Sequence, residues 1–357
     1  MGLSPMGRSF KFWIFLCLIG LSIKPTIQAT EYAIGVDVSY LKQAEDHGTV
    51  FKVNNQAQPG LKIFRDHGYN WIRLRIFHNP LAHHHPKPND LAYTITLAQQ
   101  AKKYGYKFLL DFHYSDTWAD PLYQVAPKAW QGKSPEEVEK LIFSYTRDTL
   151  VAFRQADAAP DMVQLGNEII IGLAHPYGVI PENWRGFTNL LKAAARGVEA
   201  ASENSAKPRI MLHIDRGGDL GKTRWFFDQI NQYRVPYDVI GQSFYPFWHG
   251  SLDDLRQNLK FMAETYGKDI MVVEAGYNWR PAEYINKPAP FPETPEGQRD
   301  FLKAVNRIVQ ETPQGKGIGI FWWEPAVGLN HPDLRSRGYF DDEGNALPII
   351  EVFKKKN

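Results

Sequence analysis

Lys107-Phe-Leu-Leu-Asp-Phe-His-Tyr114 is a short apolar run that ends in polar and aromatic side chains. Runs of this length, rich in β-branched and aromatic residues, are typical of buried parallel strands. Seven further runs of the same kind follow or precede it: AIGVDVSY from Ala33, WIRLRIF from Trp71, MVQLGNEI from Met162, RIMLHID from Arg209, VIGQSFYP from Val239, DIMVVEAGY from Asp269 and GIGIFWWEPA from Gly317. Eight is the number of strands in a (β/α)8 barrel.

Helical segments separate these strands. Residues 91–105 end at a glycine where a helix would stop, and residues 134–155 begin with an N-cap serine followed by proline and two acids. Residues 253–267 and 294–310 are likewise predicted to be helical. The alternation predicts an α/β fold, a single-domain (β/α)8 TIM barrel over residues 30–357. An open doubly wound sheet is the alternative, but no glycine-rich phosphate-binding turn follows the first strand.

The composition is that of a folded protein. Of the 357 residues, 43% are hydrophobic and 22% are charged, which excludes a disordered or collagen-like chain. Lys and Arg (41) nearly balance Asp and Glu (39), so no overall field favours nucleic acid or an anionic membrane. The chain has 10 Trp, 17 Tyr and 21 Phe, and so many Trp favour a surface that stacks flat apolar faces of a ligand.

The first residues form a separate segment. Arg8 and Lys11 precede an uncharged apolar run, residues 12–23, and Ala29 follows a polar stretch. This pattern predicts a signal peptide over residues 1–29 and a secreted or periplasmic protein, with no membrane attachment in the mature form. An uncleaved membrane anchor is the alternative, although the run is short for a bilayer. Cleavage would remove Cys17, the only cysteine. We expect the mature protein to be a monomer.

Two glutamates stand out among the polar residues at the predicted strand ends, where such barrels hold their active sites. Glu168 ends the fourth strand and Glu274 the seventh, across the barrel mouth from one another. Cleavage of a glycosidic bond needs two carboxyl groups facing the anomeric carbon, one protonated and one ionised. The two glutamates therefore predict the catalytic pair of a glycosidase. Structural ion pairs with the arginines of the second strand are the alternative.

Other strand-end side chains are candidates for binding a sugar. We expect the charge of Arg75 to keep Glu274 ionised and Asn167 to hydrogen-bond a sugar hydroxyl. Trp323 can form the floor under the reacting sugar, because indole faces match the apolar faces of pyranose rings. The further candidates for holding hydroxyls or orienting the carboxylates are His113, Tyr245 and His213, while a structural role fits His213, Arg73 and Asp215 equally well.

Seven segments, in order, carry a resemblance to a known family: GVDVSYLKQAEDHG, NWIRLRIFHNP, LLDFHYSDTWADP followed by QVAPKAW, VQLGNEI, FYPFWHGSLDDL, VVEAGY and FWWEPA. They resemble the arabinogalactan endo-β-1,4-galactanases of glycoside hydrolase family 53, in the clan of (β/α)8 retaining glycosidases. The resemblance implies Glu168 as acid/base, Glu274 as nucleophile, and Asp116 and Trp118 as contacts that select the sugar. It implies a retaining endo-hydrolase of β-1,4-galactan, the arabinogalactan type I side chains of pectin.

We expect no cofactor. Relatives that bind calcium carry an acidic, glycine-rich loop after the seventh strand, where this chain has NWRPAEYINKPAPFPETPEGQ. Consecutive histidines in a proline-rich loop, residues 83–85, make a poor preorganised metal site. Residues 341–345 resemble part of a calcium loop but are more simply an acidic turn.

Two other functions stay open. A mannanase or xylanase of the same clan would carry the same catalytic pair, because these carboxylates do not select the sugar. A non-catalytic carbohydrate-binding protein on the same scaffold would be expected to lack one carboxylate, whereas both are present.

Overall fold

Eight parallel strands in the described part of the chain close into a barrel, in the order β1-β12-β11-β10-β9-β6-β5-β4. Pairing of β1 with both β12 and β4 completes the ring. The predicted (β/α)8 barrel is confirmed, and the open sheet is excluded. The barrel strands are β1 Ala33–Asp37, β4 Trp71–Ile76, β5 Lys107–Phe112, β6 Met162–Leu165, β9 Arg209–Ile214, β10 Val239–Phe244, β11 Asp269–Ala275 and β12 Gly317–Trp323.

The computed structural model describes residues 1–3, 31–83, 87–203, 205–282, 289–328 and 331–355. They divide into two units, Met1–Glu31 and Tyr32–Asn357, of which the second contains the barrel. Residues 4–30, most of the predicted signal peptide, lie outside the described residues. Within the described ranges, no helix is both long and apolar enough to cross a membrane.

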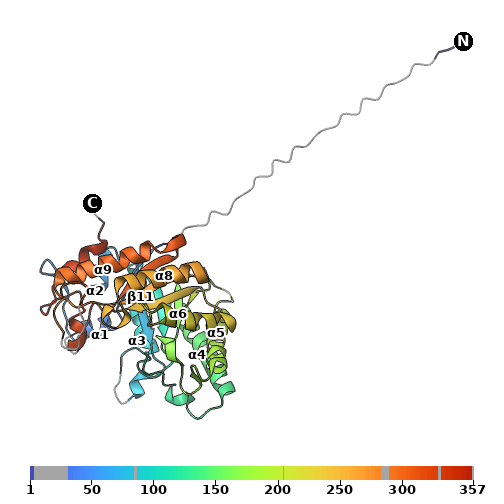
Figure 1. The fold of residues 1–357 in the computed structure, drawn as a ribbon, viewed down its shortest axis with the longest axis horizontal. Coiled ribbons are helices and arrows are strands. Elements are labelled where there is room, and N and C mark those ends of the chain that lie inside the picture. Colours follow the sequence, from blue (N-terminus) through green and yellow to red (C-terminus); the bar gives the residue numbers. More distant parts are fainter. Residues whose placement is uncertain (4–30, 84–86, 204, 283–288, 329–330, 356–357) are drawn as a thin grey trace. The chain divides into compact units, whose positions relative to one another are not determined.

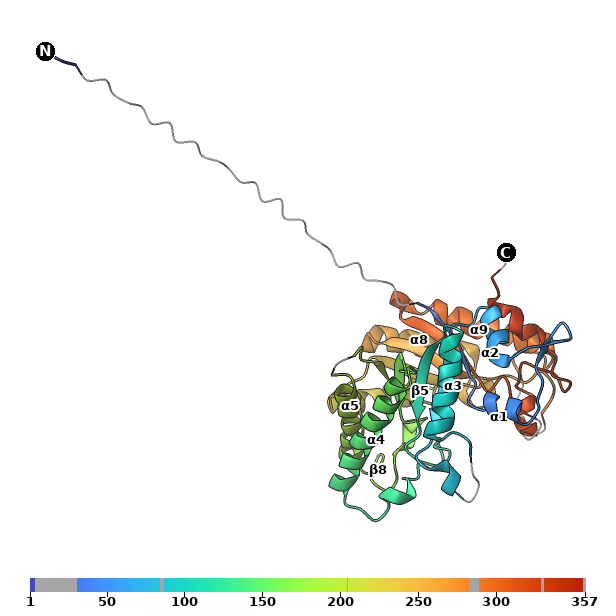
Figure 2. The same cartoon turned by 180° about the vertical axis from the view of Figure 1, so that it is seen from behind.

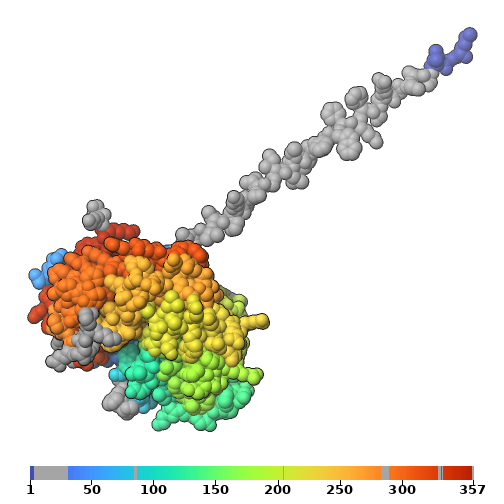
Figure 3. All heavy atoms as spheres, viewed as in Figure 1, coloured from blue at the N-terminus to red at the C-terminus, as the bar shows by residue number. Residues whose placement is uncertain are grey.

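Helices surround the strands (Figure 1), and α4 and α5 lie side by side in both ribbon views (Figure 2). In the space-filling view, α6, α8 and α9, coloured yellow to orange, form one continuous outer face (Figure 3). The helices are α1 Leu41–Asp46, α2 Gly60–Asp66, α3 Leu91–Lys103, α4 Pro135–Gln155, α5 Trp184–Ala201, α6 Leu220–Gln232, α7 Pro246–His249, α8 Leu252–Tyr266, α9 Pro295–Gln310 and α10 Pro332–Arg335. Two small hairpins lie outside the barrel: β2 Lys52–Val53 with β3 Gln56–Ala57, and β7 Gly172–Leu173 with β8 Gly178–Val179. The 3-10 turns are Pro80–Ala82, Lys128–Trp130, Ile169–Ile171, Pro313–Gly315 and Pro348–Phe353.

Local sequence explains where the longest helix begins. Ser134 and Glu137 form a capping box at the start of α4: the Glu137 backbone N–H donates to Ser134 Oγ (3.2 Å), and the Ser134 N–H donates to the Glu137 carboxylate (2.7 Å). This arrangement satisfies two backbone donors that the first turn would leave without partners. The start predicted from the sequence is confirmed.

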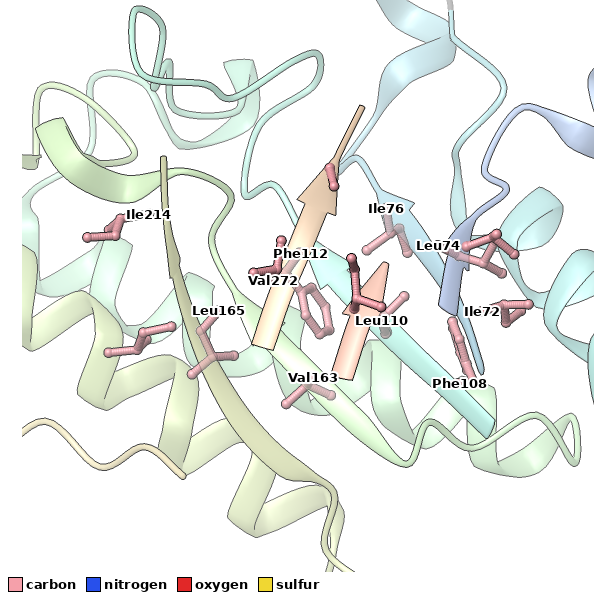
Figure 4. Close-up of a cluster of buried hydrophobic side chains, with 14 of the residues drawn as sticks. Ile72, Leu74, Ile76, Phe108, Leu110, Phe112, Val163, Leu165, Ile214 and Val272 are labelled. Carbon is pink, nitrogen blue, oxygen red and sulfur yellow. The ribbon is translucent and has the colours of Figure 1, made fainter. Parts of the chain in front are cut away.

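Side chains alternate between the two faces of each strand. Ile72, Leu74 and Ile76 on β4 belong to the apolar core between barrel and helices, shown in Figure 4 with their counterparts on β5 and β6. Arg73 and Arg75 therefore project to the inside of the barrel. Two buried arginines on one strand require carboxylates nearby, and these lie in the site described below.

The barrel interior below the arginines is a second, separate apolar cluster. It is built from inward-facing residues of all eight strands: Ala33, Trp71, Leu109, Met162, Met211, Val239, Met271, Val273, Ile318 and Phe321. Gly35 lacks a side chain because a Cβ there would lie 2.2 Å from the Phe321 ring. The interior is thus filled at one end, and the polar layer lies toward the carboxyl ends of the strands.

Candidate active site

A cavity of about 500 Å³ opens at the carboxyl ends of the barrel strands. It brings together Glu168 and Glu274 with most of the predicted sugar-binding residues. The predicted residues on its wall are Arg75, His113, Trp118, Asn167, Glu168, Tyr245, Glu274 and Trp323, and the others are Arg73, Ala119, Asp120, Pro121, Leu122, Asp215, Arg216, Trp248, His249 and Arg337.

Glu274, on β11, is buried and held through both of its carboxylate oxygens. Oε1 lies 2.8 Å from Arg73 Nη1, and Oε2 accepts a hydrogen bond from the Tyr245 hydroxyl (3.1 Å). Burial raises the pKa of Glu274 to about 6, although the Arg73 charge and the Tyr245 hydrogen bond favour the ionised form. This carboxyl group is therefore ionised at neutral pH.

Glu168 is buried in a different environment. It follows β6 with its backbone in the left-handed region (φ +47°), a conformation that non-glycine residues rarely adopt and that is found most often at functional sites. Its Oε1 accepts a hydrogen bond from Ser243 Oγ (2.6 Å). Burial, with the negative charges of Glu274 and Asp215, raises the pKa of Glu168 well above its usual range. The environments of the two glutamates thus differ: a cation opposes the effect of burial on the pKa of Glu274, whereas further carboxylates add to it at Glu168.

Arg73 connects the strands under the two glutamates. Its Nη1 contacts Asp37 (2.7 Å) as well as Glu274, and its Nη2 donates to Asp111 (2.8 Å). Nη2 also donates to Asn167 Oδ1 (2.8 Å). The side chain is 1% exposed, so all these interactions operate away from solvent. The sequence left a structural role and a role in the site equally open for Arg73. In the structure it is the cation that holds the Glu274 carboxylate.

The expectation that Arg75 keeps Glu274 ionised is corrected by this geometry. Arg75 Nη1 lies 2.6 Å from Glu324, and the guanidinium carbon lies 4.3 Å and 4.4 Å from the ring centres of Tyr40 and Trp118. Arg73 and Arg75 are two residues apart and both point inward, so they occupy successive layers of the barrel. Arg73 is in the layer that reaches Glu274, while Arg75 is held between two aromatic rings.

Asn167 and His213 lie next to the two glutamates. Asn167 Nδ2 donates one hydrogen to the Ala119 carbonyl (2.9 Å), and the residue lines the cavity. His213 is fully buried below the cavity wall, so it is not placed to contact a substrate directly. Its Nε2 lies 2.8 Å from Ser243 Oγ, the group that donates to Glu168. Burial and the Arg73 charge lower the pKa of His213 well below its usual range, so it orients Ser243 as a neutral ring.

Asp116 lies outside the cavity. It accepts hydrogen bonds from the backbone N–H groups of Asn79 (3.0 Å) and Lys128 (2.8 Å) and lies 3.3 Å from His78 in a separate hollow. These contacts fix the loop that carries Trp118. The end of the same loop is joined to the barrel by a hydrogen bond, in which the Ala119 N–H donates to His113 Nδ1 (3.0 Å).

The two tryptophans at the end of β12 face opposite ways. Trp322 is buried in the outer core, where its indole N–H donates to the Arg337 carbonyl (2.9 Å). Trp323 is half-buried and lines the cavity, with its ring centre 6.2 Å from that of Trp118. The predicted position of Trp323 in the site agrees with this geometry.

Metal ligands are a separate question. The residues that the structure describes contain no group of three or more His, Cys, Asp or Glu side chains arranged for a metal. Residues 84–86 and 283–288, parts of two loops considered above, lie outside them. Asp341 Oδ1 accepts the backbone N–H groups of Glu343 and Asn345 (3.0 and 2.7 Å), the hydrogen bonding of an acidic turn.

Several residues of the cavity were not predicted from the sequence. Ser243 does not line the cavity but donates to Glu168, and it was not predicted either, although the alternation along β10 would have placed it inside the barrel. Trp248 follows the same strand and is 52% exposed. Arg337 belongs to the irregular segment after β12, where no periodicity indicates a side chain's direction.

A (β/α)8 barrel with two buried carboxyl groups in one cavity at its mouth has the architecture of a glycoside hydrolase. The chain belongs to glycosyl hydrolase family 53, whose family model matches residues 33–353. It is 36% identical over 342 residues to an arabinogalactan endo-β-1,4-galactanase of Thermothelomyces thermophilus, covering 90% of this chain and 98% of that protein.

Other similarities agree with this membership. An "Uncharacterized protein in bgaB 5'region" of Niallia circulans is 40% identical over 350 residues, covering 90% of this chain and 93% of that protein. A solved fungal β-1,4-galactanase superposes with a TM-score of 0.83 at 35% identity, over 90% of this chain and 98% of that one. A GH113 β-1,4-mannanase, at 14% identity and a TM-score of 0.55, shares the fold alone.

Replacement of Arg73 by methionine should lower the free energy of unfolding by about 3–5 kcal/mol, because it leaves buried carboxylates without their cation. Arg209→Met is the matched control: its ion pair with Asp269 is partly exposed, so we expect a loss of about 1 kcal/mol or less. Urea unfolding followed by circular dichroism measures both. Equal losses in the two variants would contradict the central role of Arg73.

Proposed function

We propose that the protein is a retaining endo-hydrolase of β-1,4-galactan. The observation that carries the proposal is a difference between the partners of the two carboxyl groups. That of Glu274 contacts the cation Arg73 (2.8 Å), whereas that of Glu168 accepts a hydrogen bond from neutral Ser243 and, among the described residues, contacts no cation. The names of the relatives support galactan as the substrate. A mannanase or xylanase is less favoured, because such enzymes match only in fold.

In the first step, Glu168 donates its proton to the glycosidic oxygen while ionised Glu274 attacks the anomeric carbon. Arg73 and Tyr245 hold the Glu274 carboxylate in place, which reduces the cost of orienting the nucleophile. In the second step, the Glu168 carboxylate takes a proton from water, and the water oxygen displaces Glu274 from the sugar. Asn167, which has a second amide hydrogen, can donate to a hydroxyl of the reacting sugar, and Trp323 offers its ring to the apolar face.

We also propose that residues 1–29 direct export and that the mature protein is a monomer that begins at Thr30. N-terminal sequencing of the exported protein and light scattering of the purified form test these points.

Glu168→Gln and Glu274→Gln should each reduce the rate of galactan hydrolysis at least about a thousandfold, because each removes a group that the two-step reaction requires. Glu199→Gln, a change on the outer surface where Glu199 pairs with Lys207, is the matched control. With an activated galactoside, azide should restore turnover in the Glu168 variant, since it replaces the base-activated water. In Glu274→Ala it should give a glycosyl azide of inverted configuration. Substantial hydrolysis by either Gln variant would disprove the assignment.

Retention of configuration is the second expected property. Retaining enzymes hold their two carboxyl groups about 5–5.5 Å apart, because one must reach the anomeric carbon directly. Proton NMR of the early reaction should therefore show the β-anomer first. If the α-anomer appeared first, the double displacement would be wrong, although two catalytic carboxyl groups would still be needed.

Tyr245→Phe tests the link between the hydroxyl donor and the nucleophile. The Tyr245 hydrogen bond lowers the pKa of Glu274, so its loss raises that pKa. Activity requires ionised Glu274 and is lost as the pH falls through its pKa. The acidic limb of the kcat profile should therefore move to higher pH, and kcat should fall about tenfold or more. Tyr266→Phe, whose hydroxyl donates to Asp228 on the outer surface, is the control. An unchanged acidic limb in Tyr245→Phe would argue against this coupling.

A further inference from the structure

Among the described residues, the ion pairs of the cavity wall leave one arginine without a carboxylate partner. Every carboxylate on its wall has a partner on the protein: Arg73 for Glu274, Ser243 for Glu168, Arg216 for Asp215, and the backbone N–H groups of Leu122 and Tyr123 for Asp120. Three of the arginines on the wall are neutralised as well, since Arg73, Arg75 and Arg216 form ion pairs with carboxylates.

Arg337 is the exception. In the described ranges of the chain it forms no ion pair, and its Nε is buried without a hydrogen-bond partner. The side chain is half-buried and lines the cavity. A guanidinium that is partly removed from water and lacks an anion has hydrogen-bond donors left for a ligand.

The position of Arg337 is fixed by its surroundings. Its guanidinium carbon lies 5.0 Å from the ring centre of Trp323 and 5.8 Å from that of Tyr245, so the cation rests against two aromatic rings. Gly276 leaves the space that this packing needs, because a Cβ there would lie 2.8 Å from the Tyr245 ring and 3.4 Å from Arg337 Cδ. The Arg337 backbone carbonyl accepts the Trp322 indole N–H (2.9 Å). The donors are therefore preorganised beside the expected sugar platform.

We propose that Arg337 selects glycan chains that carry a carboxylate, a uronic acid, on a sugar unit bound beside Trp323. The planar guanidinium fork matches a carboxylate with two parallel hydrogen bonds, and such charge-assisted pairs are stronger than those to neutral hydroxyls. A substrate carboxylate would supply the ion-pair partner that Arg337 does not have among the described residues. This inference rests on the proposed glycanase function and extends it to a substrate class.

Matched oligosaccharides test this selectivity. One set consists of neutral β-1,4-galacto-oligosaccharides, and the other of the same oligosaccharides with the C6 alcohol of a single unit oxidised to a carboxylate, each unit in turn. The measurements are kcat/KM for cleavage and, in the Glu168→Gln variant, Kd by titration calorimetry. For at least one position of the carboxylate, the wild-type protein should prefer the acidic form about tenfold at low ionic strength. The preference should decline as salt is added.

Two charge-removing variants identify the cation. Arg337→Gln should abolish the preference, whereas Arg256→Gln should keep it, because Arg256 lies on the outer helix α8 and pairs with Asp253 (3.5 Å). Arg337→Lys retains the charge without the planar fork and should keep part of the preference.

The outcomes separate this inference from the proposed function. Cleavage of neutral galactan without a preference at any carboxylate position would overturn the role of Arg337 and leave the proposed function intact. A preference that persists in Arg337→Gln would overturn it too. If no galactan were cleaved but Glu168→Gln bound an acidic oligosaccharide more tightly through Arg337, the proposed function would fail and the inference would stand.

Discussion

The site depends on the buried ion pairs of Arg73. A guanidinium that is 1% exposed must have its charge compensated inside the protein, and here the anions come from three different strands. Asp37 ends β1, Asp111 lies on β5 and Glu274 on β11, so one side chain joins distant parts of the ring. Because Glu274 is one of these anions, the group that stabilises the polar layer also sets the state of the proposed nucleophile.

Burial without a cation gives the second glutamate the opposite property. The apolar cluster below the polar layer keeps water out of the lower barrel, so charges above it interact through a medium of low dielectric constant. Glu274 contacts Arg73 in this medium, whereas Glu168 faces a serine hydroxyl and two further carboxylates. The same desolvation raises the pKa of both carboxyl groups, but among the described residues only at Glu274 does a contacting cation oppose the rise. The asymmetry comes from the position of one arginine rather than from any difference between the two glutamates.

The sequence predicted the barrel because eight apolar runs and their intervening helices are local patterns that depend on period and length. It placed Glu168 and Glu274 because strand ends of a parallel barrel converge at one mouth. It assigned Arg75 instead of Arg73 to Glu274, since both obey the same inward alternation and only side-chain packing decides which one reaches that carboxylate. Asp116 and Arg337 lie in irregular segments, where direction depends on contacts with distant residues such as Lys128 and Tyr245. The inward direction of Ser243, in contrast, could have been predicted from strand alternation alone.

The wall of the cavity combines arginines with aromatic rings. Arg75 lies between Tyr40 and Trp118, and Arg337 lies against Trp323. Each ring restrains the cation beside it, and each cation borders an apolar face with hydrogen-bond donors. A pyranose ring has the complementary surface, an apolar face with a polar edge. Because the aromatic contacts already restrict these long side chains, a bound sugar would not have to order them. The stacking that restrains these side chains thus also reduces the entropy lost when a glycan binds.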